Sequence, residues 1–109
     1  MIRTVDEDLI EEIVRRLIAA IDPDRIILFG SRARGDSGPD SDIDLLIIKD
    51  TRLSFAERAR RVSQIIGRHV FPLDLIVLTP GEVQRRLKAF DPFLEEALSH
   101  GRILYDKNG

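Results

Sequence analysis

Two aspartates, Asp42 and Asp44, stand at the start of an apolar run in the middle of the chain and could together bind a divalent cation. Residues two apart on a β-strand point to the same face of a sheet, with Cα atoms roughly 6.5–7 Å apart. Carboxylates at that spacing can converge on hard cations, which prefer oxygen ligands. Without a partner, two acids on an otherwise buried strand would repel each other and each lose several kcal/mol of hydration. A bound divalent cation would remove that penalty.

An upstream turn, Gly30-Ser31, ends the apolar run that begins at Ile26 and could hold a phosphate. Glycine lacks a Cβ, so a bulky anion can approach the backbone there and the turn can use a positive φ. The Ser31 hydroxyl and backbone N–H could bind phosphate oxygens, and Arg32 and Arg34 add positive charge nearby. A single Gly-Ser is a common turn, as a single Asp-x-Asp is a common loop. Their combination points to phosphate and metal chemistry.

A third carboxylate, Asp74, lies inside a later apolar run over residues 71–77. A charge on an otherwise apolar strand is unfavourable without compensation. The residues alone leave two interpretations open: an acid exposed at the edge of a sheet, or a further ligand for a cation held by the upstream pair. Asp40 is close enough in sequence to assist a metal, but its surroundings are those of a loop.

The spacing of these motifs resembles the signature of the DNA polymerase β-like nucleotidyltransferase superfamily: Gly30-Ser31, ten residues, then Asp42 and Asp44. The short chain and the letters GSRARG and SDIDLLI resemble the minimal nucleotidyltransferase (MNT) branch, commonly the antitoxin of a HEPN-domain RNase toxin. The resemblance covers nearly the whole chain, and the two-part motif is specific.

The resemblance implies a fold and a metal site. The fold would be α/β, of the α+β kind, with a mixed sheet of about four strands flanked by helices, and residues 1–109 would form a single nucleotidyltransferase domain. Asp42, Asp44 and Asp74 would be the catalytic carboxylates and would also bind Mg²⁺ or Mn²⁺, with two ions expected. Asp74 would hold the metal that activates the acceptor hydroxyl and could act as the base for that hydroxyl.

The resemblance also implies a reaction. ATP would be bound by the glycine-containing turn through Gly30, Ser31, Arg32 and Arg34, and AMP would pass to a hydroxyl of a partner HEPN toxin, that of a tyrosine. No residue in the sequence identifies the base or the acceptor. The helical domain with which larger relatives, such as aminoglycoside nucleotidyltransferases, bind small substrates is not visible, so we expect a partner protein to complete the pocket.

Two other function classes are weighed against this one. The chain could be a binding module that neutralises a toxin by covering it, with a weak or vestigial site. A transferase directed to nucleic acid is disfavoured by the net charge of −2 and by the few aromatic residues. No apolar run approaches the roughly 18–20 residues of a membrane span. The absence of cysteine fits a cytoplasmic protein.

Hydrophobic periodicity and capping signals predict the order of the elements. Arg58, Arg60, Arg61 and Arg68 are expected mostly on a solvated helix face, the alternative being contact with a triphosphate or an acidic partner, and His69 has no clear role. In the first half, the pattern predicts a helix from a capping box at Thr4 to about Ala20, a central strand Arg25–Phe29 and a strand Asp42–Ile48. A helix opened by Ser54, with Phe55 and Val70 on its apolar face, and a strand over 71–77 follow. The chain then forms a helix from Pro80 to about Lys88, a helix Phe93–Ser99, an edge strand Arg102–Tyr105 and a frayed tail from Lys107.

Overall fold

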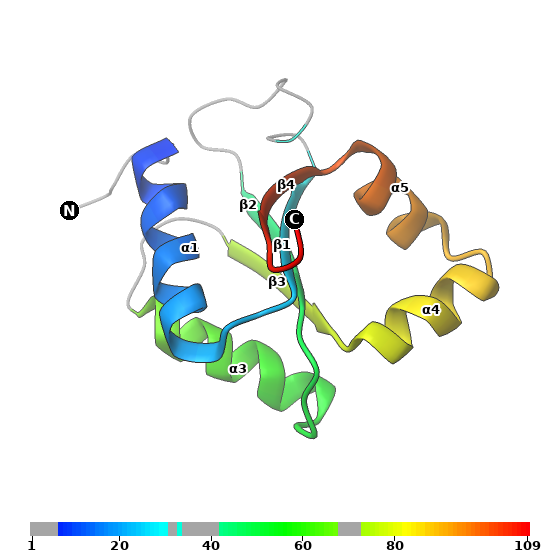
Figure 1. Ribbon diagram of the computed structural model, residues 1–109, viewed down its shortest axis with the longest axis horizontal. Coiled ribbons are helices and arrows are strands. Elements are labelled where there is room, and N and C mark those ends of the chain that lie inside the picture. Colours follow the sequence, from blue (N-terminus) through cyan, green and yellow to red (C-terminus); the bar gives the residue numbers. More distant parts are fainter. Residues whose placement is uncertain (1–6, 31–32, 34–41, 68–72) are drawn as a thin grey trace.

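A four-stranded mixed sheet forms the centre of the protein, for which a computed structural model describes residues 7–30, 33, 42–67 and 73–109 (Figure 1). The strand order is β3-β2-β1-β4. The two central strands are antiparallel to each other, β4 is antiparallel to β1, and β3 is parallel to β2. The strands are β1 (Arg25–Phe29), β2 (Ile43–Ile48), β3 (Leu73–Leu78) and β4 (Arg102–Asp106).

Helices cover both faces of this sheet, as Figure 1 shows. One face packs against α1 (Glu7–Ile21) and α3 (Phe55–Ile66), and the other against α4 (Pro80–Lys88) and α5 (Pro92–His100). The central strands are therefore apolar on both sides, which confirms the predicted α+β class and the central place of Arg25–Phe29. Among the described residues, no helix has the length and apolar character needed to cross a membrane.

The helix starts follow the predicted capping signals. Ser54 and Thr79 each accept a hydrogen bond from the backbone of the residue three positions on, and the glutamate there bonds back, so both capping boxes are confirmed. α3 ends at Ile66, before Gly67 at φ +85°. The capping box at Thr4, and Val70 on the predicted apolar face, lie outside the described residues.

Two predictions at the surface are wrong. Phe55 is 52% exposed, because the buried residues of α3 lie in its C-terminal half, while Phe55 is its first residue. The C-terminal residues are not frayed: the Lys107 backbone N–H donates to the Asp24 carbonyl (2.9 Å), and its ammonium lies 3.1 Å from the Asp22 carboxylate. The chain end is thus fixed to the turn between α1 and β1.

Arg58 was also misplaced by the sequence pattern, which put it on a solvated face. Its side chain is only 10% exposed, and its guanidinium donates to the Glu82 carboxylate (2.6 Å) and to the carbonyls of Val77 (3.2 Å) and Leu53 (2.8 Å). Glu82 also accepts from the Thr79 backbone N–H, and this bond, helped by Arg58, lowers the pKa of Glu82. The ion pair therefore joins α3 to the junction of β3 and α4.

Replacing Arg58 with alanine should destabilise the fold by about 1.5–3 kcal/mol, because three charge-assisted hydrogen bonds of a nearly buried group are lost. The measurement is urea unfolding at neutral pH. Arg60→Ala, which removes an exposed arginine from the same helix, is the control and should change stability by no more than about 0.5 kcal/mol. Equal effects of the two substitutions would contradict the structural role given to Arg58.

Candidate active site

Three aspartates meet at one end of the β2–β3 pair. Asp44 in β2 lies directly beside Asp74 in β3 in the parallel register, and Asp42 immediately precedes β2. One carboxylate oxygen from each of the three lies within 4.8 Å of the others. Asp42 and Asp74 are exposed and Asp44 is partly buried. The structure thus brings together all three carboxylates that the sequence singled out.

The structure shows where Asp74 lies, and its role as a ligand for a cation stays a prediction. β3 is an outermost strand of the described sheet, so Asp74 is an exposed acid on an edge strand. Because β3 is parallel to β2 and in register with it, the same residue is also the neighbour of Asp44. The sequence could not decide this point, since it does not state which strands are neighbours.

The carboxylates lie on the face of the sheet that carries α4 and α5. Asp44 alternates with Leu46 and Ile48, which pack in the core under those helices, and it pairs across the strands with Phe29. Side chains two apart on a strand, and those directly opposite across two strands, share a face. Asp74, Asp44 and Phe29 therefore form one row across the sheet.

The electrostatics of this cluster make it suited to a cation. The pKa of Asp44 is raised to about 6, first by partial burial, then by a hydrogen bond with Asp74 and by repulsion from Asp74 and Asp42. Such crowding is unfavourable for three anions and favourable for a divalent ion, whose ligands in proteins are oxygens of this kind. The donor set fits Mg²⁺ or Mn²⁺, and Asp42, Asp44 and Asp74 are the residues that could hold it.

The turn after β1 touches this cluster through Gly30. Gly30 has φ +76°, a conformation that residues with a Cβ rarely adopt, and a Cβ placed on it would collide with Oδ2 of Asp44. A side chain at this position would therefore be strained by the backbone conformation and would displace the Asp44 carboxylate. Ser31, Arg32 and Arg34, and the loop acid Asp40, lie outside the described residues.

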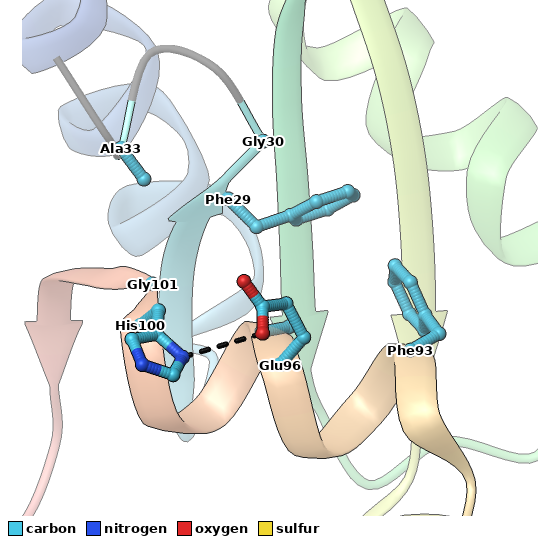
Figure 2. Close-up of a pocket in the computed structure, with 8 residues that line it drawn as sticks. Phe29, Gly30, Ala33, Phe93, Glu96, His100 and Gly101 are labelled. Atoms are coloured by element: carbon cyan, nitrogen blue, oxygen red, sulfur yellow. Dashed lines mark ion pairs between the residues drawn. The ribbon is translucent and has the colours of Figure 1, made fainter. Parts of the chain in front are cut away.

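Beside the turn is a hollow of about 170 Å³ (Figure 2). Phe29 and Phe93 meet edge to face in its wall, with ring centroids 5.2 Å apart, and Nδ1 of His100 lies 3.3 Å from the Glu96 carboxylate at its rim. Sequence reasoning missed it, although Phe93, Ala97 and His100 recur at helical spacing along one stripe of α5. The lining of the hollow includes Phe29, Gly30, Ala33, Phe93, Glu96 and His100.

Comparison with known proteins decides the family. Residues 11–109 match the family model described as "Polymerase beta, Nucleotidyltransferase". The chain belongs to this nucleotidyltransferase family. A relative from Methanocaldococcus jannaschii, MJ0141, named as a candidate protein adenylyltransferase, is 32% identical over 78 residues, which make up 72% of this chain and 75% of that protein. Family and fold agree with the resemblance to the minimal nucleotidyltransferases.

Solved structures support the same nucleotidyltransferase fold. A candidate nucleotidyltransferase from Sulfolobus solfataricus is 26% identical, with a TM-score of 0.66, over 93% of this chain and 80% of that one. The crystal structure of a toxin–antitoxin with AMP-PNP is similar at a TM-score of 0.55 and 21% identity, over 89% of this chain and 73% of that one. At that identity the second likeness shows the fold alone.

Replacing Gly30 with alanine should destabilise the nucleotidyltransferase domain by about 1–3 kcal/mol, since a Cβ is strained at φ +76° and displaces the Asp44 carboxylate. Urea unfolding measures this. Gly81→Ala is the matched control: Gly81 is in the first turn of α4, where a Cβ would make only an ordinary contact, 3.5 Å from Arg85, and alanine favours helix. A Gly30→Ala protein as stable as the Gly81→Ala protein would be the contradicting result.

The raised pKa of Asp44 predicts how stability depends on pH without metal. Because the folded carboxyl holds its proton up to about pH 6, against an ordinary value of 3.8, its contribution is fully present below pH 3.8 and is lost as pH rises through 6. Asp44→Asn should therefore be more stable than the wild type at pH 8, by on the order of 1 kcal/mol after solvent screening, and no more stable at pH 4.

The measurement for this prediction is urea unfolding in EDTA at the two pH values. Asp50→Asn, which removes a carboxylate from the connection after the other end of β2, controls for the change in net charge. A gain at pH 8 that is the same for both variants would show that net charge, and not the cluster, is responsible.

Proposed function

We propose that this protein is a metal-dependent nucleotidyltransferase that transfers AMP from ATP to a hydroxyl group of a partner protein. The observation that carries the proposal is the convergence of three carboxylates within 4.8 Å of one another, next to a turn in which Gly30 has a positive φ. Membership of the nucleotidyltransferase family supports the reaction class.

The proposed roles follow from where each carboxylate lies. Asp42, Asp44 and Asp74 hold Mg²⁺ or Mn²⁺, with two ions expected. When bound, such a metal neutralises phosphate charge and favours attack on phosphorus. Asp74, exposed on the outer strand, is the carboxylate that an acceptor hydroxyl can approach from solvent. Asp44 lies between Phe29 and Asp74 across the sheet, where it would hold the metal together with Asp42 and Asp74.

The bond changes balance without any further reactant. The acceptor oxygen forms a bond to the α-phosphorus of ATP, and the bond from that phosphorus to the pyrophosphate oxygen breaks. The hydroxyl proton passes to the carboxylate of Asp74, which can then release it to water. The products are an AMP ester of the acceptor and pyrophosphate.

The nucleotide is proposed to bind on the Gly30 side of the carboxylates. Gly30 lets phosphate oxygens approach the backbone, and Ser31, Arg32 and Arg34 would supply a hydroxyl and positive charge. ATP as the donor is supported by the name of the Methanocaldococcus relative, an adenylyltransferase, and by AMP-PNP, an ATP analogue, in the toxin–antitoxin structure of the same fold.

The acceptor is proposed to be a tyrosine of a HEPN-domain toxin, so that AMP transfer silences the toxin and the protein acts as an antitoxin. Support comes from the toxin–antitoxin structure of similar fold and from the relative named as acting on protein. The exposure of Asp42 and Asp74 is compatible with a bulky acceptor, because a protein surface can reach a carboxylate that is not covered by the rest of the chain.

The proposal is tested by label transfer. The purified protein is incubated with Mg²⁺, cell lysate and ATP labelled on the α-phosphate, and one protein band should gain label. The double variant Asp42→Asn/Asp44→Asn should transfer none, since both carboxylates are needed to hold the metal. Label on the γ-phosphate should not appear in the band, which separates AMP transfer from phosphorylation. Mass spectrometry of the band then names the acceptor side chain.

One outcome would replace the proposal with another function. If no band is labelled, yet the wild-type and double-variant proteins retain the same partner, the protein acts by binding alone. The carboxylate cluster would then be a structural metal site at most, and the alternative of a non-catalytic antitoxin would stand.

A further inference from the structure

The row of side chains that contains Asp44 and Asp74 ends at the outer edge of β3, where main-chain groups are available for pairing. β3 is the last strand of the described sheet on this side, so it has a strand neighbour only in β2. In a parallel pair, alternate residues direct both their N–H and their C=O to the same neighbour. The residues of β3 that point away from β2 could therefore bind an additional strand.

Two hydrogen bonds show which residues of β3 point outward. The Leu78 carbonyl accepts a hydrogen bond from the Lys49 N–H, just after β2 (3.0 Å), so Leu78 faces β2. The Val77 carbonyl, one residue earlier, accepts from the guanidinium of Arg58 instead (3.2 Å). Val77 and the residues two and four positions before it therefore face the outer edge.

This edge is closed at one end and open at the other. Arg58 occupies the Val77 carbonyl, and that half of β3 is buried. By the same alternation, Leu73 and Leu75 direct their N–H and C=O outward, and no described strand pairs with them there. Asp74 lies between these two residues and is exposed. The open part of the edge is thus the part that flanks the carboxylate.

An antiparallel strand added at this edge would extend the row of side chains by one. Its hydrogen bonds would go to Leu73 and Leu75, so the residue opposite Asp74 would form a non-hydrogen-bonded pair, the closer kind, with Cα atoms about 4.5 Å apart. Directly opposite residues share a face of the sheet, which places the added side chain on the side that carries Asp44. A tyrosine is longer than an aspartate, so its hydroxyl would reach past the carboxylates, toward a bound cation.

Charge argues against a second copy of this chain as the added strand. Two β3 strands paired antiparallel over their open parts would set Asp74 directly opposite Asp74 of the other copy, and like charges in that position are unfavourable. A different protein has no such conflict. The occupant is also an extended segment and not a helix, because the N–H and C=O groups of a sheet edge bind another main chain.

We propose that the partner protein docks by adding an extended segment to the outer edge of β3, antiparallel to it, with the acceptor tyrosine opposite Asp74. This inference rests on the proposed function, since it assigns how the acceptor of AMP is held. The main chain supplies the binding contacts, and the register selects the side chain that is modified. A shift of the segment by one residue would turn the tyrosine to the opposite face of the sheet, away from the carboxylates.

The test uses the purified protein, Mg²⁺, ATP labelled on the α-phosphate and a capped pentapeptide, Thr-Val-Tyr-Val-Thr, as the strand-forming probe. Its tyrosine should gain label. With the tyrosine opposite Asp74, the N–H groups of the two valines face β3 and those of the two threonines face away. N-methylation of both valines should lower AMP transfer at least about tenfold, because two main-chain hydrogen bonds are lost. N-methylation of both threonines is the matched control and should leave transfer nearly unchanged.

Amide hydrogen exchange followed by NMR gives a second readout that does not require AMP transfer. The peptide at millimolar concentration should slow exchange at Leu73 and Leu75, and less at Ile76, whose N–H already faces β2. Equal labelling of the two N-methylated peptides would overturn the docking mode and leave the proposed function standing. The same conclusion follows if the protein labels a partner in lysate, yet the peptide gains no label and slows exchange at neither leucine. If neither partner nor peptide is labelled, the docking mode and the proposed function fall together.

Discussion

Three carboxylates gathered at one end of the β2–β3 pair repel one another, and the rest of the fold supplies the free energy that keeps them together. The two strands are held in parallel register by apolar side chains packed on both faces of the sheet, and that register places Asp44 beside Asp74. A slip of one residue would turn Asp44 to the opposite face and bury it among the side chains of α1 and α3. The register is therefore specified by the core, and the site inherits its geometry from residues that take no part in chemistry.

The site is also asymmetric. On the β1 side it is bordered by Gly30, the aromatic pair Phe29 and Phe93, and α5, whereas on the β3 side it ends at an edge strand whose Asp74 is exposed. The proposed function uses this difference by placing the phosphate oxygens of the nucleotide at the turn and the acceptor at the edge strand. Family membership supports the reaction class, and the proposed placement of the reactants depends on this asymmetry.

Local patterns in the sequence predicted the features that depend on neighbours along the chain. The period-two placement of Asp42 and Asp44, the glycine turn and the capping boxes at Ser54 and Thr79 all belong to this class, as do most element boundaries. Features that depend on packing between distant segments were missed. Arg58 is buried only because α4 brings Glu82 to it, the tail is fixed only because β4 ends beside Asp24, and the hollow exists only where α5 meets the end of β1. Phe90, whose φ is +57° in the turn between α4 and α5, carried no signal in the sequence, since its φ follows from the way two helices join.

One consequence of the strand order concerns local unfolding. The carboxylates that would share a cation belong to a central strand and to a peripheral one, and β3, with a neighbour on one side only in the described sheet, can detach at lower free energy than β1 or β2. A cation held by Asp44 and Asp74 would link this edge strand to the central strand β2. Amide hydrogen exchange in β3 would then slow as the ion binds, while exchange in β1 would follow global unfolding. Binding of the ion and pairing of β3 with β2 would thus be thermodynamically coupled.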